Sequence, residues 1–371
     1  MRRVVKFNNK TKVVLIIILA LIVILSVLGI LIYKGLSSTT NNDNLENTLT
    51  TANQEKNTEL TIDEKVDVVD INSKSRPYML VVNNTDVAVK VQEGLNKAYL
   101  VYEIPTEGNT SRLLALYKDI EDDLVVGTIR SARHNFVDFA LESDAIFCCF
   151  GWSHYAEDDM KGGSIEYLQG LYGAPFYRNN PENLVTEHTA YTSFSRLRKS
   201  VKSKGFRTTS DDSILLNYSG SDVDLSNSEN KKRANTVIIP YGAAPQIATF
   251  KYDEESKMYV RYENGIKCID HNTKEEVTTK NIITYKVDYK MCSDNYYWDL
   301  DTIGSGEGYY ITNGYALPIN WKKDSRSSKT KYTYKAGTIL DGQNVGGQEI
   351  SISDGRTWIE IQTTKQKLTI E

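Results

Sequence analysis

Residues 144–150, with the sequence DAIFCCF, form an apolar run of strand length. A run of this kind, with no alternation of polar side chains, is typical of a strand that is buried on both faces of its sheet. A helix is predicted on either side of it in the sequence. Ser131 is a suitable N-cap for the first helix and Ser153 for the second. Together these signals predict an α/β domain.

Four shorter strand-like runs precede this strand, and one more helix follows it. The runs are rich in β-branched or aromatic residues and stop at turn residues, as strands do. The helix is expected from Thr192 to Lys204, and Gly205 is well placed to end it. We therefore assign residues 76–207 to the α/β domain. The four runs are residues 78–82, 98–104, 112–117 and 124–129.

The second half of the chain has a different sequence pattern. Residues 208–233 are polar and rich in Ser, Asn and Asp, and we interpret them as a linker. From residue 234 to residue 371, strand-like runs alternate with Gly, Asn and Asp turns, and no convincing helical pattern interrupts them. This pattern predicts a β-rich C-terminal domain.

An uncharged apolar run, residues 13–33 (VVLIIILALIVILSVLGILIY), lies near the beginning of the chain. Its length matches the roughly 20 residues that a transmembrane helix needs. Residues 1–12 are rich in Lys and Arg, so the positive-inside rule places them in the cytoplasm and the domains outside the cell. A cleaved signal peptide is the alternative, although its apolar region is usually shorter. Residues 34–75 are polar and are predicted to be a flexible stalk.

The charge and the cysteine content exclude some classes of protein. A net charge of -4 and a pI near 5.8 argue against a nucleic-acid partner. The 4 cysteines are too few for a disulfide framework, and none lies close enough to residues 13–33 for N-terminal lipidation. Cys268 and Cys292 either form a bridge or remain free thiols. The 4 histidines lack metal-ligand spacing and no phosphate-binding glycine loop is present, so we predict neither a metal nor a cofactor.

Polar residues gather where the predicted strands end and the predicted helices begin. In open α/β sheets, ligands bind at the carboxyl ends of the strands. Helix N-termini at that edge offer free N–H groups, which favour anions. The sequence therefore predicts a site for a phosphate or carboxylate group. The residues predicted to bind the ligand are Arg112, Arg130, Arg133, Trp152, Ser153 and Tyr191.

Each of these residues also has a structural interpretation. Arg130 and Arg133 are suited to pair with Glu103 or Glu107, because buried charges are usually paired. Those two glutamates and His188 are alternatively candidate catalytic residues, since two carboxylates are the usual equipment for glycosidic bond cleavage. Ser153 lies in Gly-Trp-Ser-His-Tyr, which is close to a nucleophile elbow but lacks the second glycine, and a helix cap is the simpler interpretation.

Two stretches, residues 76–117 and 125–153, resemble the YerB-like lipoprotein family of Gram-positive bacteria. Further matching motifs are EHTAYTS (187–193), GSGEGYYITNG (304–314) and GRTWIEI (355–361). The resemblance implies an extracytoplasmic, membrane-tethered protein with an α/β domain and a β-rich C-terminal domain, and it implies no activity. The matching polar residues are Glu103, Glu107, Arg112, Arg130, Arg133, Ser153 and His188.

The chain departs from that family pattern in two places. A predicted transmembrane helix stands where the family has a lipidated cysteine. Residues 148–153 read CCFGWS, where the family tends to have a segment of the type His-Ala-Gly-Gly-Ser. His154 lies close enough in sequence to replace the missing histidine.

Two functions follow from these observations. The first is a non-catalytic envelope protein that binds an anionic cell-wall polymer or glycan, or a membrane partner acting on one. The second is a cell-wall hydrolase or lyase that uses Glu103, Glu107 and His188. We favour binding, because no catalytic motif is complete.

Overall fold

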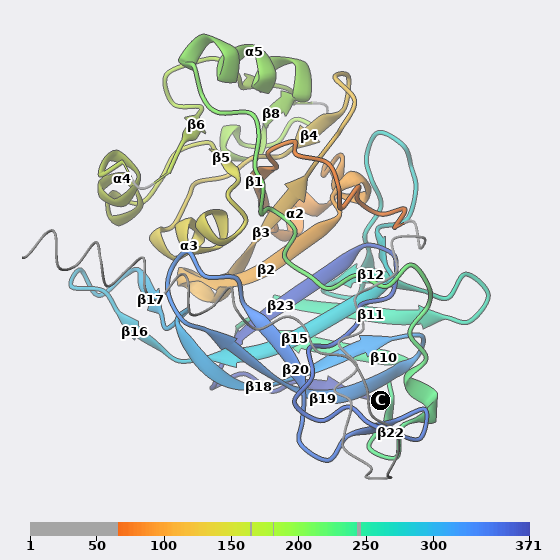
Figure 1. Cartoon of the computed structure of the whole chain (residues 1–371). Helices are drawn as coiled ribbons and strands as arrows, with labels where there is room; N and C mark the ends of the chain where they lie inside the picture. Colours follow the sequence, from red (N-terminus) through yellow and green to blue (C-terminus); the bar gives the residue numbers. More distant parts are fainter. Residues whose placement is uncertain (1–65, 164, 181, 243–245) are drawn as a thin grey trace, which may run out of the picture. The chain divides into compact units, whose positions relative to one another are not determined.

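The computed structural model describes residues 66–163, 165–180, 182–242 and 246–371 (Figure 1). Residues 61–371 belong to one compact unit. The predicted transmembrane helix, residues 13–33, and the predicted stalk as far as residue 65 lie outside the described residues. Within the described residues, no helix is both long enough and apolar enough to cross a bilayer.

The first half of this unit is a mixed sheet with helices on both faces. The apolar run of residues 144–150 forms the central strand β5, which pairs in parallel with β1 and β6. Its side chains alternate between two apolar cores, so it is buried on both faces as predicted. The strands of this half are β1 (Tyr78–Asn83), β2 (Leu100–Thr106), β3 (Thr110–Tyr117), β5 (Ile146–Cys149) and β6 (Tyr167–Gln169).

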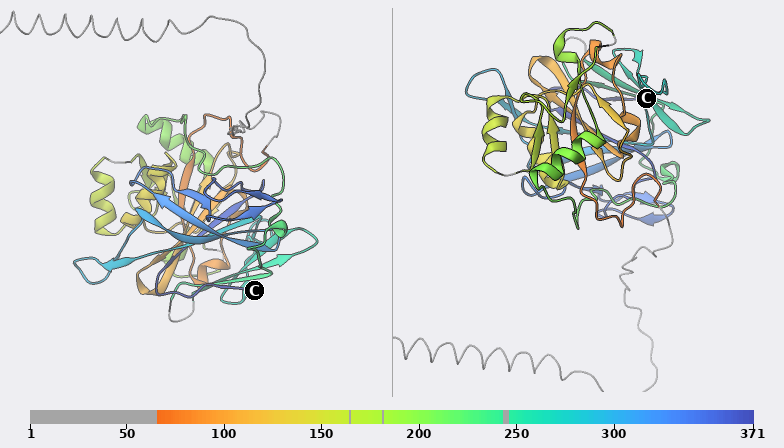
Figure 2. Two further views of the ribbon diagram at one scale, coloured as in Figure 1. Left: turned by 60° about the horizontal axis from the view of Figure 1, so that its bottom comes forward. Right: turned by 90° about the horizontal axis from the view of Figure 1, so that it is seen from above.

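Three helices cover this half of the sheet. Helices α3 (His134–Glu142) and α4 (His154–Lys161) contribute apolar side chains to the core on one face. Helix α5 (Phe194–Lys204) packs on the opposite face through Phe194, Leu197 and Val201. In the view from above in Figure 2, α5 lies in front of the strands. Helix α5 ends at Gly205, whose φ of 68° provides the predicted left-handed stop.

The predicted cap of the first helix is wrong. Helix α3 begins at His134 and Arg133 occupies its N-cap position. Ser131 instead donates its hydroxyl to the carbonyl oxygen of Phe150. The reason is that the backbone before the helix is held in extended form, by hydrogen bonds from Arg130 to Val81 and from Ala132 to Gly151. The other predicted cap is confirmed, because the Ser153 Oγ accepts a hydrogen bond from the N–H of Ala156 in α4.

One sheet runs through both halves of the chain. Strand β2 pairs in parallel with β23, from Leu100 opposite Thr357 to Glu103 opposite Glu360. Figure 1 shows the two strands lying next to each other, and within the described residues the sheet has 11 strands. The second half contributes β9 (Lys232–Arg233), β15 (Asn281–Val287), β18 (Gly304–Thr312), β19 (Tyr315–Lys323), β20 (Lys331–Tyr334) and β23 (Thr357–Thr363).

A second sheet in the C-terminal half packs on the large one. Its inward residues, including Val237, Phe250 and Tyr259, share a core with Ile282 and Trp358 of the large sheet. The C-terminal half is therefore rich in strands, as predicted. The strands of the second sheet are β10 (Thr236–Pro240), β11 (Ile247–Asp253), β12 (Met258–Glu263), β13 (Ile266–Lys267), β14 (Thr278–Thr279) and β24 (Thr369–Ile370).

Smaller elements lie around these two sheets. A three-stranded sheet is formed by β4 (Val125–Gly127), β7 (Tyr177–Arg178) and β8 (Ala190–Ser193). Strands β16 (Tyr289–Met291) and β17 (Trp298–Leu300) form a hairpin. Asn135 of α3 holds this hairpin by donating to the carbonyl oxygen of Trp298 and accepting from the N–H of Leu300.

The last ten residues of the segment predicted as a stalk lie against the body of the protein. Val66 and Val69 are buried in the core that also contains α3 and α4. The carboxylate of Asp354 accepts hydrogen bonds from the N–H groups of Asp67 and Val68. Val66 and Val69, with Val68 packed against the same core, supply enough apolar surface for this contact.

Candidate anion-binding site

The predicted site lies at one edge of the large sheet. Strands β1, β2 and β5 run parallel to one another, because β1 and β2 are each antiparallel to β3. Their carboxyl ends therefore meet at the same edge. Asn83 ends β1, and β3 places Arg112 directly opposite it. The N–H of Arg130 bonds to the carbonyl oxygen of Val81, which brings the two predicted arginines of this segment to the same edge.

Arg133 is paired with Glu107, the first residue after β2. The Nε of Arg133 lies 2.8 Å from Oε2 of Glu107, and its Nη2 also bonds that carboxylate. Burial alone would raise the pKa of Glu107, but the hydrogen bonds and charge of Arg133 outweigh it and the pKa is lowered. The guanidinium also lies 5.1 Å from the ring centre of Tyr297. One of the structural pairings considered for the arginines is therefore present.

Arg130 is paired with a glutamate that the sequence did not single out. Its Nη1 lies 3.3 Å from Oε2 of Glu187 and donates to the carbonyl oxygen of that residue. The other carboxylate oxygen of Glu187 lies 3.3 Å from Nε2 of His188. Burial lowers the pKa of His188, and the charges of Arg130 and Arg112 lower it further, while Glu187 opposes them.

Arg112 is buried and has few partners. Its Nη1 donates to the carbonyl oxygen of Ser111. Its Nε, and the Nε of Arg130, are buried without a hydrogen-bond partner among the described residues. Burial and the charges of Arg130 and Arg133 lower the pKa of Arg112 to about 9. Buried donors without partners are costly, so these two guanidinium groups are suited to receive an acceptor from a ligand.

Arg178 of β7 is a fourth arginine at this edge, and sequence reasoning missed it. Its guanidinium lies 4.2 Å from the ring centre of Phe150, just after β5, and its Nη1 donates to the carbonyl oxygen of Thr186. Burial and the charge of Arg130 lower its pKa. No local motif marks this residue, because only the folding of β7 onto β8 brings it here.

These residues are called the arginine site from here on. The four guanidinium groups face two carboxylates, which leaves an excess of positive charge at one sheet edge. Arginine is the residue best suited to planar, bidentate recognition of phosphate and carboxylate groups. The arrangement is therefore chemically suited to an anion. The arginine site consists of Arg112, Arg130, Arg133, Arg178, Glu107, Glu187 and His188.

Glu103 lies apart from the arginine site. Its side chain is fully buried, and its Oε1 accepts hydrogen bonds from Asn84 and Ser111. Its Oε2 lies 2.9 Å from Nη2 of Arg261, which comes from β12 of the second sheet. The structure therefore does not bring Glu103 and Glu107 together as a carboxylate pair facing solvent.

Arg261 is the centre of a buried ionic network that sequence reasoning also missed. Its Nη2 lies 2.6 Å from Oε2 of Glu263, and its guanidinium stacks 4.9 Å from the ring centre of Trp358. Glu360 of β23 accepts a hydrogen bond from the hydroxyl of Tyr241. Burial raises the pKa of Glu263 to about 7 and also raises the pKa of Glu360. The network joins the two sheets, and burial favours the protonated forms of Glu263 and Glu360.

The three remaining predicted residues have contacts of their own. Ser153 caps α4, which is its structural interpretation. Trp152 packs edge-on against Tyr167, with ring centres 5.9 Å apart. Tyr191 is buried, and its hydroxyl donates to the carbonyl oxygen of Val91.

The described residues also bear on metals and disulfides. Among them, no group of three or more His, Cys, Asp or Glu side chains is arranged to hold a metal ion. All four cysteines are free. Cys268 is buried, with its Sγ 3.0 Å from Nη1 of Arg261, so of the two alternatives left open for Cys268 and Cys292 the structure has the unpaired thiols.

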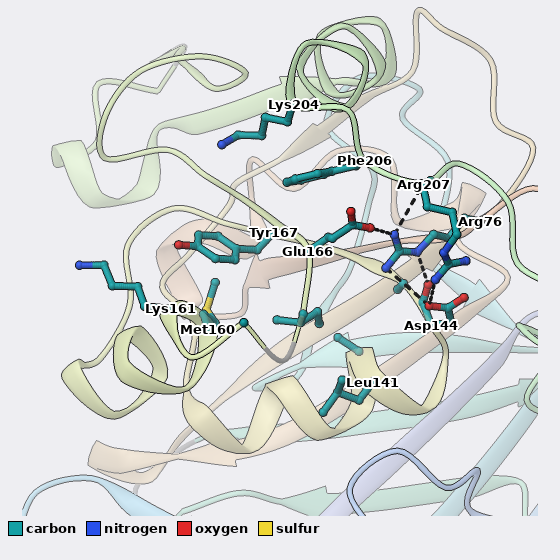
Figure 3. A pocket seen from close by; sticks show the side chains of 14 residues that line it. Arg76, Leu141, Asp144, Met160, Lys161, Glu166, Tyr167, Lys204, Phe206 and Arg207 are labelled. Carbon is teal, nitrogen blue, oxygen red and sulfur yellow. Dashed lines mark hydrogen bonds and ion pairs between the residues drawn. The ribbon is translucent and has the colours of Figure 1, made fainter. Parts of the chain in front are cut away.

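A separate hollow of about 730 Å³ lies between α3, α4 and the segment after α5 (Figure 3). On one side Arg76 and Arg207 are bound to Asp144 and Glu166, so these charges are already compensated. On the other side of Figure 3 lies Lys204. None of the predicted ligand-binding residues lines this hollow.

Comparison with known proteins agrees with this architecture. The chain matches the family model described as "Protein of unknown function (DUF3048) N-terminal domain" over residues 65–207, and the C-terminal domain of the same family over residues 237–359. The chain therefore belongs to the DUF3048 family. The N-terminal domain with a mixed sheet and the strand-rich C-terminal domain match this family.

One relative is the "Putative lipoprotein YerB" of Bacillus subtilis (strain 168). It is 28% identical over 293 residues, which cover 78% of this chain and 82% of the relative. The crystal structure of the YerB protein from Bacillus subtilis matches with a TM-score of 0.65 at 25% identity. That match covers 80% of this chain and 94% of the crystallised one.

Proposed function

We propose that this protein is a membrane-associated component of the bacterial cell envelope that binds an anionic ligand at the arginine site. The observation that carries this proposal is the excess of guanidinium groups over carboxylates at one sheet edge, with the Nε atoms of Arg112 and Arg130 buried and unpartnered. An anion bound there would offset the excess positive charge of the four guanidinium groups.

The side of the membrane on which we expect the ligand depends on how the protein is attached to the membrane. The relative from Bacillus subtilis carries the name "Putative lipoprotein YerB", and a lipoprotein is attached to a membrane by lipid. In this chain we propose that residues 13–33 serve as the anchor, with the described domains outside the cell. The anions offered at that place are wall polymers with phosphate groups and glycans with carboxylate groups. An anionic wall polymer or glycan is therefore the ligand class we favour, with an envelope protein acting on it as the next.

The structure gives less support to a hydrolase or lyase. Glu103 is fully enclosed by Asn84, Ser111 and Arg261, so it has no path to a substrate. Glu107 is bound by Arg133, which lowers its pKa and disfavours the protonated acid that glycosidic bond cleavage requires. No observation in the described residues specifically favours catalysis over binding.

Calorimetric titration of the full chain in detergent tests the proposal. The probes are a soluble poly(glycerol phosphate) fragment and soluble peptidoglycan fragments. We expect at least one to bind, and Arg112→Gln to weaken that binding by at least tenfold at low salt. Arg233→Gln is the matched control, because Arg233 is a half-exposed arginine of β9, away from the site. Failure of both probes to bind, or equal binding by Arg112→Gln, would overturn the proposal.

A further inference from the structure

Three large apolar side chains stand out from the surface on the two segments that border the arginine site. Tyr172 is 83% exposed, Val185 is 64% exposed and Leu171 is 53% exposed. Single exposed apolar residues are ordinary, but a group of them beside a charged site marks an interaction surface. We call Leu171, Tyr172 and Val185 the apolar rim.

A chain of direct contacts connects the apolar rim to the arginine site. Gly170 packs so closely on Phe150 that a Cβ on it would lie 2.3 Å from the ring. The ring of Phe150 also contacts the guanidinium of Arg178, which lies 4.2 Å from the ring centre. Arg178 in turn donates to the carbonyl oxygen of Thr186, the residue after Val185.

A second set of contacts places Leu171 near the other arginines. Gly151 lies between Ser131 and Leu171, since a Cβ on it would be 2.9 Å from the Ser131 Oγ and 3.9 Å from Cδ2 of Leu171. Ser131 is flanked in sequence by Arg130 and lies two residues before Arg133. The backbone that carries Arg130 and Arg133 therefore lies beside the apolar rim, and Arg178 is the exposed cation next to it.

We propose that the apolar rim is a lipid-contact surface, which inserts into an anionic bilayer while the neighbouring cations face the phospholipid headgroups. Tyrosine and aliphatic side chains beside arginines are the combination that enters the interface of a bilayer, and each cation near the surface adds attraction to anionic lipid. The exposed guanidinium of Arg178, which contacts both segments of the apolar rim, favours an anionic bilayer as the occupant.

The beginning of the chain strengthens this assignment. The 65 residues that precede the described part include the proposed membrane anchor, so the described domains remain close to a bilayer at high effective concentration. Under such tethering, a rim of three side chains is enough for reversible docking, although it would not hold a free protein on a membrane. Docking would place the arginine site at the membrane surface, where it meets anions near their attachment to lipid.

Fluorescence quenching of an added tryptophan tests the proposal. The full chain carrying Tyr172→Trp is reconstituted into vesicles of phosphatidylglycerol or of phosphatidylcholine, with and without bromine on the acyl chains, and the emission of the parent chain is subtracted. We expect bromine to reduce the added emission at least threefold in phosphatidylglycerol and clearly less in phosphatidylcholine. Tyr309→Trp, at a partly exposed tyrosine of β18 beside Lys232, is the control and should stay unquenched.

Two further variants separate this proposal from the proposed function. Leu171→Ser combined with Val185→Ser should reduce the quenching at position 172 and leave binding of soluble anions unchanged. Arg112→Gln should weaken the binding of soluble anions and leave most of the quenching at position 172 unchanged. Absence of quenching at position 172 in phosphatidylglycerol, or quenching equal to that of Tyr309→Trp, overturns the lipid contact even if the arginine site binds its anion.

Discussion

The amide nitrogen of Asn83 lies 2.8 Å from Nδ1 of His188, and this contact fixes the tautomer of the ring. Because the amide donates, Nδ1 is the acceptor and the proton of the neutral ring resides on Nε2, which faces Glu187. Arg112 and Arg130 lower the pKa of the same ring. The protonation of His188 is therefore a sensitive measure of the charge at the arginine site.

We expect inorganic phosphate to raise the pKa of His188. A bound anion offsets the positive potential of Arg112 and Arg130, so the protonated ring becomes less unfavourable. Titration of the imidazole resonances by NMR, with and without saturating phosphate, measures the change. His271, whose ring contacts Glu93 and Glu182 rather than an arginine, is the internal control. An unchanged His188 pKa in saturating phosphate would show that the anion binds elsewhere.

Arg112→Met should make the protein more stable while it weakens anion binding. Arg112 is buried, its Nε lacks a partner and neighbouring arginines repel it, so an apolar side chain of similar length relieves both costs. We expect the free energy of unfolding to rise by about 1 kcal/mol. Urea denaturation measures it.

Arg133→Met is the comparison for that prediction. It should lower the free energy of unfolding by about 3 kcal/mol, because Glu107 would remain buried without its partner. If both variants shift stability in the same direction, the assignment of Arg112 as an uncompensated charge is wrong.

Stability should fall as the pH rises through neutrality, because of the buried carboxyl of Glu263. Its pKa in the folded protein is raised to about 7 by burial, whereas an unfolded glutamate has its ordinary value near 4.5. Between these values the native state holds a proton that the unfolded state has lost, so the stabilisation is complete below the lower pKa and is lost as the pH passes the higher one. The loss amounts to at most about 3 kcal/mol.

Chemical denaturation at pH 5, 6, 7 and 8 measures this dependence, at protein concentrations and salt held constant. Glu263→Gln should flatten the profile, because the amide cannot ionise. Glu276→Gln, at a half-exposed surface residue paired with Lys267, should leave the slope as it is. A wild-type profile that rises from pH 5 to pH 8 would contradict the assignment.

Ser153→Ala should lower the stability of the protein and leave ligand binding unchanged. Loss of the cap leaves the N–H of Ala156 unpaired, which should lower the free energy of unfolding by about 1 kcal/mol. Ser153→Asp should restore most of that loss, because a carboxylate also caps a helix. Thermal unfolding measures both variants. A nucleophilic role would be indicated if both variants lost ligand turnover or binding while they kept wild-type stability.

The core strand and the site edge were predictable from local sequence. The apolar run around Ile146 and Phe147 is strong enough to fix β5, and Gly205 ends α5 where its backbone freedom allows. Parallel strands then bring the residues after them to one edge, so Arg112, Arg130 and Arg133 could be placed together without coordinates.

The partners within the site could not be predicted in the same way. Arg178 and Glu187 reach the edge through pairing of β7 with β8, which has no signature in a single sequence. Glu103 and Glu107 are four residues apart, yet a strand end between them sends one to the buried network and the other to Arg133. Arg261 meets Glu103 across 158 residues of chain, a distance at which periodicity carries no information.

The pairing of β2 with β23 has a consequence for how the protein is made. Strand β23 fills the slot between β15 and β2, although β2 is synthesised more than 250 residues before it. Until β23 is available, the β2 edge has unsatisfied backbone groups and invites pairing with other chains. Completion of the large sheet must therefore wait until β23 has been synthesised.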